Sequence, residues 1–497
     1  MHTQGNILSL LVFFVWVPMA LWGAKRWPPA KTAAILLLVP LMFLPEKVYF
    51  KAPGFPRFTK DEIAVFWLFI GVLLFHRDRL RTVVLGRWIK LSMALLMGGA
   101  VCTVLLNSDP IRDGTVYLVA HRPYDAWHAV LVDLFSYVLP FVLAAAMFRT
   151  RQDLRTLLRL IVAAALVYSL FQMFELRFSP QLHRWIYGFF QHSFRQTIRA
   201  GGYRPTVFMS HGLAVGLFTM VAVLAAAGLN KAKVRVFGFP AKYAMGYLWL
   251  LLSVSKSVAA LLYSVVALPM VWFLSPKNQY RIATGIALIV LLYPTLRGAD
   301  LVPVEEIRDW VQEQYGDERV TSIMTRFVNE KNLLEKASER PFFGWGTFGR
   351  ASLYNPKTGW QTATRDGDWI ITWGEFGRVG FFGKYLLMLL PIFIGARRLK
   401  LVRRLSDRRL LATLALMVAF SVFDLLPNGN FNYLVTVLAG ALLGCSEGIV
   451  RQQAHARWVK RKQASLNAGS PSGTMEDDEQ RETQPRPLRG RGPSEAF

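Results

Sequence analysis

Long apolar runs separated by short polar stretches recur along the chain from residue 6 to residue 449. A run of about 20 apolar residues can cross the hydrocarbon core of a bilayer as a helix. The pattern predicts about thirteen spanning helices, with twelve or fourteen as alternatives: 6–23, 32–45, 61–75, 91–106, 129–148, 160–176, 206–229, 244–255, 257–274, 282–296, 369–395, 410–427 and 431–449. The pair at 244–274 is also compatible with one long helix. The first run lacks a basic region before it, which favours a retained span over a cleaved signal peptide.

Composition supports this interpretation. Hydrophobic residues make up 53% of the 497 residues and charged residues only 18%, whereas a soluble protein has about 25% charged residues. The apolar content excludes disorder for most of the chain. The two cysteines, Cys102 and Cys445, both lie inside apolar runs, which favours buried thiols over a disulfide. We therefore expect an all-α polytopic integral membrane protein.

The formal net charge of +26 comes largely from short loops between apolar runs. Such loops face the cytoplasm by the positive-inside rule, so nucleic acid is not an expected partner. Alternating spans place one set of basic residues on that side: Lys25, Arg26, Lys31, Arg77, Arg79, Arg81, Arg87, Lys90, Arg149, Arg151, Arg155, Arg159, Lys231, Lys233, Arg235, Lys242, Arg397, Arg398, Lys400, Arg403, Arg404, Arg408 and Arg409. The Pro/Gly/Ser-rich residues 450–497 are expected to form a disordered cytoplasmic tail.

Three longer segments fall on the opposite, extracytoplasmic side: 107–128, 177–205 and 297–368. The last has 12 acidic and 10 basic residues and is long enough for a small domain. Helical spacing appears at 305–315 and 322–339, and Pro341 with the glycines of PFFGWGTFG ends the second helix. The expected division of the chain is N-terminal helices 1–176, an Arg-rich segment with central helices 177–296, a loop domain 297–368, C-terminal helices 369–449 and the tail 450–497.

The segment 177–205 carries five arginines and no acidic residue on a side where basic clusters are disfavoured. Its apolar residues follow helical spacing, which predicts a helix in the membrane interface with a polar face containing Arg184, Gln191, Arg195 and Arg199. One interpretation is anchoring to membrane lipid headgroups. The other is a site for an anionic group such as a lipid-linked phosphate, because guanidinium groups match phosphate geometry.

Two polar groups follow at the mouths of spans. Arg204 and His211 lie in AGGYRPTVFMSHG, where the glycines let the backbone approach a ligand and Pro205 suits a first helical turn. Ionisable residues at such positions favour function, although arginine can instead snorkel and histidine can pack between helices. Lys256 lies among serines in LLLSVSKSVAALL, either in a polar turn or close enough to reach an anion.

The order of these elements resembles the bacterial O-antigen ligase and polysaccharide polymerase family. The resemblance covers roughly residues 199–395 and rests on YRPTVFMSHG, SVSKSV, one large loop with Arg326 at the head of a helix that ends in PFFGWG, and the E-x-G-x-x-G pattern Glu375–Gly380. Each element alone is unspecific, and the ordered set carries the resemblance.

The resemblance implies a metal-independent glycosyltransferase of the GT-C type in the bacterial inner membrane, with no cofactor. Its donor would be a polyprenyl-pyrophosphate-linked glycan, and its acceptor a hydroxyl of a glycan or lipid on the periplasmic face. Carried over to this chain, Arg204 and Arg326 would bind pyrophosphate, with Lys256 weaker, and Arg195 and Arg199 nearby. Fixed guanidinium groups would stabilise the leaving group. Other polysaccharide-assembly proteins are conceivable partners.

One feature departs from the family pattern. Ligases of this family usually show a His-Asn pair shortly before the Glu of E-x-G-x-x-G, whereas this chain has Asp366-Gly367. Asp366, Asp368 or His211 remains as a catalytic candidate. The alternatives are a solvated loop for Asp366, a helix N-cap for Asp368 and a helix-dipole complement for Glu375. The missing histidine favours a polymerase-like member over a ligase.

Two other functions are compatible with a polytopic protein. The first is a transporter or a flippase for a lipid-linked glycan, although the sequence shows no internal repeat of the kind common in transporters. The second is a non-catalytic scaffold of an envelope assembly complex, which would tolerate charge reversal at the arginines.

Overall fold

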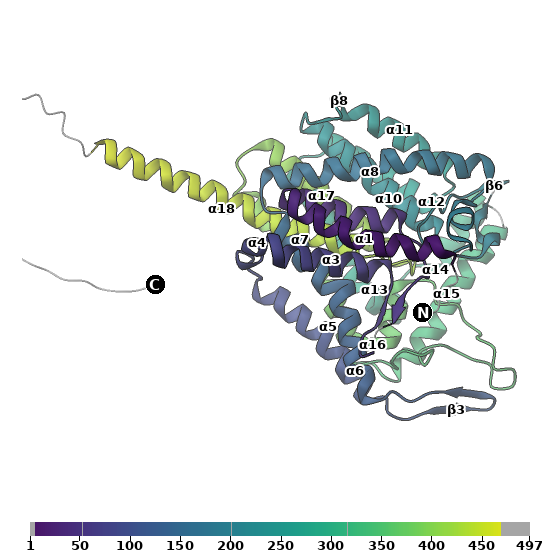
Figure 1. Cartoon of the computed structure of the whole chain (residues 1–497). Helices are drawn as coiled ribbons and strands as arrows, with labels where there is room; N and C mark the ends of the chain where they lie inside the picture. Colours follow the sequence, from purple (N-terminus) through teal and green to yellow (C-terminus); the bar gives the residue numbers. More distant parts are fainter. Residues whose placement is uncertain (1–4, 52, 200, 316, 469–497) are drawn as a thin grey trace, which may run out of the picture. The chain divides into compact units, whose positions relative to one another are not determined.

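The chain is a largely helical, multi-pass membrane protein. A computed structural model describes residues 5–51, 53–199, 201–315 and 317–468. Eight helices in this part are long and apolar enough to cross a membrane, and the apolar helices Pro29–Phe43 and Val258–Phe273 are shorter. The helices lie side by side, as Figure 1 shows.

The described helices are α1 (Ile7–Arg26), α2 (Pro29–Phe43), α3 (Lys60–Phe75), α4 (Arg77–Arg81), α5 (Arg87–Leu105), α6 (Pro123–Asp133), the π-helix η1 (Leu134–Val138), α7 (Leu139–Met147), α8 (Arg151–Phe178), α9 (Leu182–Tyr187), the 3-10 helix η2 (Phe194–Thr197), α10 (Gly212–Lys231), α11 (Ala241–Val254), α12 (Val258–Phe273), α13 (Pro276–Gly298), α14 (Val304–Tyr315), α15 (Asp317–Ser338), α16 (Asp368–Leu399), α17 (Leu405–Phe423) and α18 (Leu434–Ala468). Four antiparallel hairpins join strands β1 (Phe50–Lys51) and β2 (Arg57–Phe58), β3 (Ile111–Asp113) and β4 (Val116–Leu118), β5 (Ile198–Arg199) and β6 (Gly202–Tyr203), and β7 (Arg235–Val236) and β8 (Phe239–Pro240).

Every apolar run expected to span the membrane overlaps a helix. The run 129–148 combines α6, η1 and α7, and the run 244–274 forms the two helices α11 and α12. Helix starts follow local signals. Thr59 and Glu62 form a capping box before α3, and Thr150 and Asp153 form one before α8. Such boxes satisfy backbone N–H groups that have no partner inside the helix.

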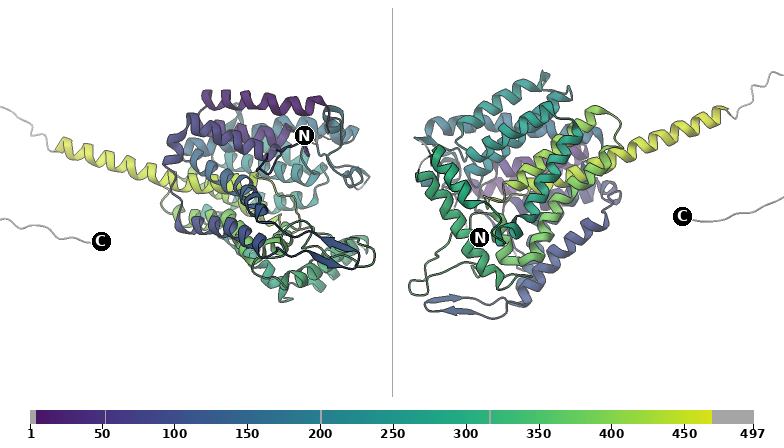
Figure 2. Two further views of the ribbon diagram at one scale, coloured as in Figure 1. Left: turned by 60° about the horizontal axis from the view of Figure 1, so that its bottom comes forward. Right: turned by 180° about the vertical axis from the view of Figure 1, so that it is seen from behind.

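The helices alternate between two ends, which we name the basic end and the loop end. Polar contacts tie the connections of the basic end together: Arg79 pairs with Asp153 at 3.3 Å, Arg151 pairs with Asp407 at 2.8 Å, and Arg409 donates to the carbonyl of Lys231 at 3.0 Å. The loop end carries the hairpins β1–β2, β3–β4 and β5–β6 and residues 299–367, and Figure 2 shows it from two further sides.

The turn after α15 fits into a break in α16. Gly377 has φ 63° and ψ −162° inside α16, where the two halves of the helix meet. The turn supplies contacts at this break, since the N–H groups of Arg378 and Val379 donate to the carbonyls of Pro341 and Phe342 at 2.9 and 3.0 Å. In return, the N–H of Trp345 donates to Gly374 at 2.9 Å. The PFFGWG and E-x-G-x-x-G patterns therefore form one interlocked structure.

The prediction of one interfacial helix over residues 181–200 is wrong. Helix α9 ends at Tyr187, and Gly188 follows in the left-handed conformation with φ 88°. The N–H of Asn6 donates to the carbonyl of Tyr187 at 3.0 Å, so Asn6 binds a carbonyl at the end of α9 that a continuing helix would use. Gln191, expected on a polar face, is 1% exposed and bonds the carbonyls of Val207 and Met209.

Two further expectations need correction. Pro205 does not open the next span, because α10 begins at Gly212 and residues 204–211 form a loop. Arg326 does not head a helix, because α15 begins at Asp317. The predicted helices at 305–315 and 322–339 correspond to α14 and α15.

The chain divides into two compact units, Met1–Gln452 and Gln453–Phe497. Within the second unit the helix α18 continues to Ala468, so the start of the expected disordered tail is helical. The remainder of that tail, 469–497, lies outside the described residues. Cys102 and Cys445 are free thiols, as expected.

Candidate functional site

Arg204 lies at the loop end, where its guanidinium group forms hydrogen bonds to the turn between α11 and α12. Its Nε and Nη2 donate to the carbonyl of Lys256 at 3.2 and 2.8 Å. The ammonium group of Lys256 donates in turn to the carbonyl of Arg199 at 3.0 Å. Two sequence patterns 52 residues apart therefore meet. We name these residues, with two more from the same loop, the cationic site: Arg195, Arg199, Arg204, His211 and Lys256.

Backbone conformation and small residues make this meeting possible. Lys256 has φ 56°, a left-handed conformation that is uncommon for residues other than glycine, and the turn it forms separates α11 from α12. A Cβ atom on Gly212 would meet the Arg204 side chain, and one on Gly216 would meet Ser257 at 2.6 Å. The glycines of YRPTVFMSHGLAVG therefore allow the arginine and the serine turn to pack closely on α10.

Three of the five residues of the cationic site are arginines. Within the part of the chain that the structure describes, Arg195, Arg199 and Arg204 form no ion pair with a carboxylate, and the first two are exposed. Burial, followed by the like charge of Arg199, lowers the pKa of Arg204 to about 10. Arg204 thus stays charged at neutral pH. A half-buried, charged guanidinium group with exposed neighbours of the same sign suits an anionic ligand.

His211 caps α10 rather than facing the arginines as a base. Its Nδ1 accepts from the N–H of Leu213 at 3.0 Å, and its Nε2 lies 3.3 Å from the side-chain oxygen of Gln196. Burial, followed by the nearby His192 and Arg204, lowers the pKa of His211 to about 4. A neutral ring whose two nitrogens are both engaged fits a positioning role in the loop.

Glu175 holds the loop that carries Arg204. This buried carboxylate at the end of α8 accepts from the N–H groups of Thr206 and Val207 at 2.8 and 2.7 Å, and from that of Leu182 at 3.2 Å. Tyr168 accepts from the N–H of Phe208 at 3.0 Å. Side chains from α8 thus accept hydrogen bonds from loop N–H groups that have no helical carbonyl to bind. The sequence signal was an acidic residue inside an otherwise apolar span.

Replacing Glu175 with alanine is expected to destabilise the protein by about 3 kcal/mol or more, because each buried N–H left without a partner costs about 1–3 kcal/mol. Glu175→Gln keeps one carbonyl oxygen and is expected to cost less. Thermal unfolding in detergent measures both. Leu170→Ala, a change on the exposed side of the same helix, is the control. Equal melting temperatures for Glu175→Ala and Leu170→Ala would contradict this role.

Arg326 and Asp366 form a second group at the loop end. The Nε of Arg326 lies 3.6 Å from a carboxylate oxygen of Asp366, and its Nη1 donates to the carbonyl of Pro427 at 3.4 Å. Both side chains are accessible, with 47% and 32% of their surfaces exposed. The neighbouring Arg365 is bound to Glu375 at 2.6 Å, so Glu375 acts as an ion-pair partner rather than as a complement to the helix dipole.

Asp368 belongs to neither group. It is the first residue of α16 and not its N-cap, which is Gly367. Its side chain is buried and pairs with Lys384 at 2.7 Å, and it accepts from the hydroxyl of Tyr385 at 2.8 Å. A buried charge pair of this kind is expensive to break, because the remaining partner would stay buried without compensation. The geometry therefore favours a structural role for Asp368 and leaves Asp366 as the accessible carboxylate.

The cationic site and the Arg326–Asp366 pair are linked through α12. Asp424, in the turn that also contains Pro427, lies within hydrogen-bonding range of Tyr263 on α12. Tyr263 follows Ser257 by six residues, which is about 9 Å along a helix. No contact among the described residues joins the two groups directly.

Among the described residues, no three His, Cys, Asp or Glu side chains gather as a possible metal site. A comparison with models of known protein families and a search of curated proteins found no match to this chain. The functional argument therefore depends on the chemistry of the side chains and on the resemblance in motif order.

Proposed function

We propose that the protein is a membrane glycosyltransferase of the O-antigen ligase and polymerase type, with a polyprenyl-pyrophosphate-linked glycan as donor. The observation that carries the proposal is the cationic site. The guanidinium group of Arg204 donates to the carbonyl of Lys256, and the loop after Arg204 is held by the buried Glu175. Exposed arginines lie beside Arg204, and none of these arginines pairs with a carboxylate in the described chain. Such a site suits a diphosphate attached to a lipid at the membrane surface.

The reaction is a displacement at the anomeric carbon of the donor sugar. The acceptor hydroxyl forms the new C–O bond while the bond from that carbon to the diphosphate breaks, and the electron pair leaves with the diphosphate. Arg204 and Lys256 stabilise the negative charge of the leaving group. Asp366 takes the hydroxyl proton, since its side chain is accessible and lies beside Arg326.

We further infer which membrane holds the protein and whether it resembles a polymerase or a ligase. The protein resides in the bacterial inner membrane, with the loop end facing the periplasm and the basic end and the tail facing the cytoplasm, as the positive-inside rule requires. A polymerase-like reaction, in which the acceptor is a second glycan, fits the absence of the family histidine before Glu375.

A transfer assay in proteoliposomes tests the proposal. The full chain is mixed with a polyprenyl-diphosphate-linked oligosaccharide, and release of polyprenyl diphosphate is measured together with glycan length. We expect the amount of polyprenyl diphosphate released to equal the number of units added to the glycan, without added metal. Movement of the lipid-linked glycan across the bilayer without release of polyprenyl diphosphate would instead establish a flippase and overturn the proposal.

A further inference from the structure

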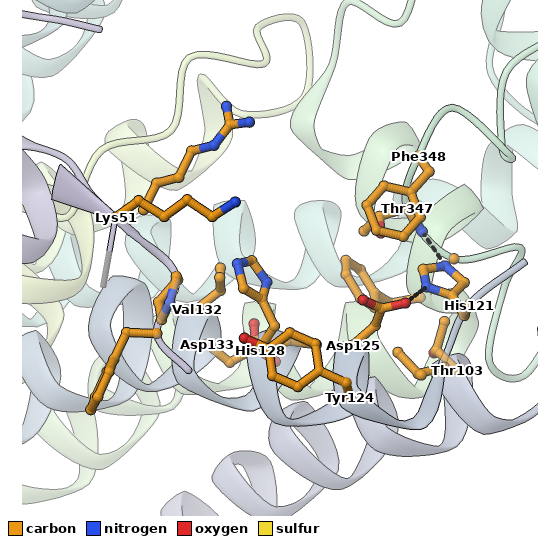
Figure 3. A pocket seen from close by; sticks show the side chains of 17 residues that line it. Lys51, Thr103, His121, Tyr124, Asp125, His128, Val132, Asp133, Thr347 and Phe348 are labelled. Atoms are coloured by element: carbon orange, nitrogen blue, oxygen red, sulfur yellow. Dashed lines mark hydrogen bonds and ion pairs between the residues drawn. The ribbon is translucent and has the colours of Figure 1, made fainter. Parts of the chain in front are cut away.

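A cavity of about 650 Å³ lies at the loop end, apart from the residues discussed above. Its walls come from α6, from the β1–β2 hairpin and from the turn 346–348 after α15, with Phe376 of α16. Figure 3 shows the side chains that line it. None of the cationic-site residues and neither Arg326 nor Asp366 belongs to its lining.

One wall of the cavity is held rigidly. His121 is buried, and its Nε2 accepts from the N–H of Thr347 at 3.1 Å, so its Nδ1 carries the proton and faces Asp125 at 3.7 Å. Asp125 also accepts from the N–H of Arg122 at 2.7 Å. The Phe348 ring stacks near His121, with 4.9 Å between the centroids. This network joins α6 to the turn that locks α16, and it fixes an aromatic face at the cavity.

The opposite wall carries positive charge. Lys51, Arg57 and His128 line it, and within the described chain Lys51 and Arg57 form no ion pair. Arg57 lies over the ring of Tyr49 at 4.8 Å, which leaves its N–H groups available at the edge. In Figure 3, Lys51 and His128 lie on the same side of the cavity, across from His121 and Phe348.

A buried carboxylate forms part of the lining. Asp133 is 6% exposed, lines the cavity, and makes no hydrogen bond or ion pair within the described residues. Burying a charged or polar group without a partner is costly, so such a group inside a membrane span indicates function. The π-helix η1 starts at the next residue, Leu134, and π-helical turns are frequent at functional sites. The cavity is therefore a candidate binding site in which the side chain of Asp133 is available to a ligand.

We propose that this cavity binds an acidic sugar unit of the glycan. Tyr124 and Phe348 offer aromatic faces to the C–H face of a sugar ring. Asp133 and His128 can bond the hydroxyl groups, and Lys51 and Arg57 meet a carboxylate or phosphate substituent. The identification of the ligand as a glycan depends on the proposed function, whereas the cavity chemistry itself does not.

Direct binding tests this inference. The full chain in nanodiscs of neutral lipid is titrated with tetragalacturonate and, separately, with the uncharged maltotetraose. We expect tetragalacturonate to bind at least about 10-fold more tightly, since charge-assisted bonds to Lys51 and Arg57 add about 1.4 kcal/mol or more. The double variant Lys51→Ala/Arg57→Ala should abolish this difference, and Asp133→Asn should weaken both ligands. Arg112→Ala, an exposed arginine on β3 outside the cavity, is the control.

Three outcomes would overturn the inference: equal binding of the two saccharides, unchanged binding in the double variant, or displacement of tetragalacturonate by phosphatidylglycerol vesicles, which would identify a lipid-headgroup site. Failure of the proposed function is distinguishable. Saccharide binding without release of polyprenyl diphosphate would reject the proposed transferase and support the saccharide site in the cavity. Glycan transfer without tetragalacturonate binding would support the transferase and reject the saccharide site.

Discussion

Replacing Arg204 with alanine is expected to lower glycan transfer at least about 100-fold, the loss typical when one fixed donor to a developing negative charge is removed. Arg204 donates from Nε and Nη2 to the carbonyl of Lys256, and these two bonds fix the orientation of its guanidinium group. Arg204→Lys should recover only part of the activity, because lysine keeps the charge and loses the planar fork. Release of polyprenyl diphosphate in proteoliposomes measures the rate.

The control for this change is Arg184→Ala. Arg184 lies on α9 of the same arginine-rich segment, is exposed, and belongs to no part of the cationic site. It should transfer glycan at the rate of the unchanged protein. Full activity of Arg204→Ala, or an equal loss in Arg184→Ala, would show that the segment acts by general attraction to the membrane surface and not through a defined anion site.

The pH dependence follows from the same groups. The pKa of Arg204, lowered to about 10, lies above the neutral range, so the charged form that the proposed donor site requires is present at lower pH and is lost only as pH rises through about 10. His211, with a pKa lowered to about 4, is neutral from pH 6 to pH 8. Neither group therefore gives a titration step in the donor affinity within that range.

The sequence predicted which chemistry gathers at the loop end because alternation of spans fixes which residues share a side. Arg204 and Lys256 both lie at span ends of the same side, and they meet. Conformation within the loops was less accessible. Helix α9 ends just before Gly188, where Asn6 from the start of the chain packs against it, a tertiary contact that helical spacing does not contain. Periodicity alone therefore predicted a helix that is too long.

The supporting carboxylates were missed for a different reason. Glu175 and Asp133 each lie within or at the end of an apolar run, where a single acidic residue hardly changes the hydrophobic pattern. The role of each residue depends on the groups around its side chain. Glu175 accepts from three backbone N–H groups, and Asp133 lines a cavity. Their presence in the sequence could still have indicated a role. An acidic residue in a membrane span is energetically unfavourable, so such a residue usually has a functional or structural partner.

Replacing Gly377 with alanine is expected to prevent stable folding of the loop end. The backbone at φ 63° and ψ −162° is in a region that is essentially restricted to glycine. A Cβ atom there would also lie 2.5 Å from the backbone carbon and oxygen of Phe342. Strain costs about 1–3 kcal/mol and overpacking a similar amount, so the sum approaches the stability of many domains. The fraction of monodisperse protein in detergent and its melting temperature measure the loss.

Two variants separate this mechanism from a general effect of alanine in membrane helices. Gly285→Ala, in α13, places its Cβ in open space and should leave the melting temperature unchanged or slightly higher. Phe342→Ala combined with Gly377→Ala should not rescue folding, because the clash involves the backbone of residue 342 and not its ring. Rescue by Phe342→Ala would show that side-chain crowding, and not backbone contact, sets the requirement for glycine.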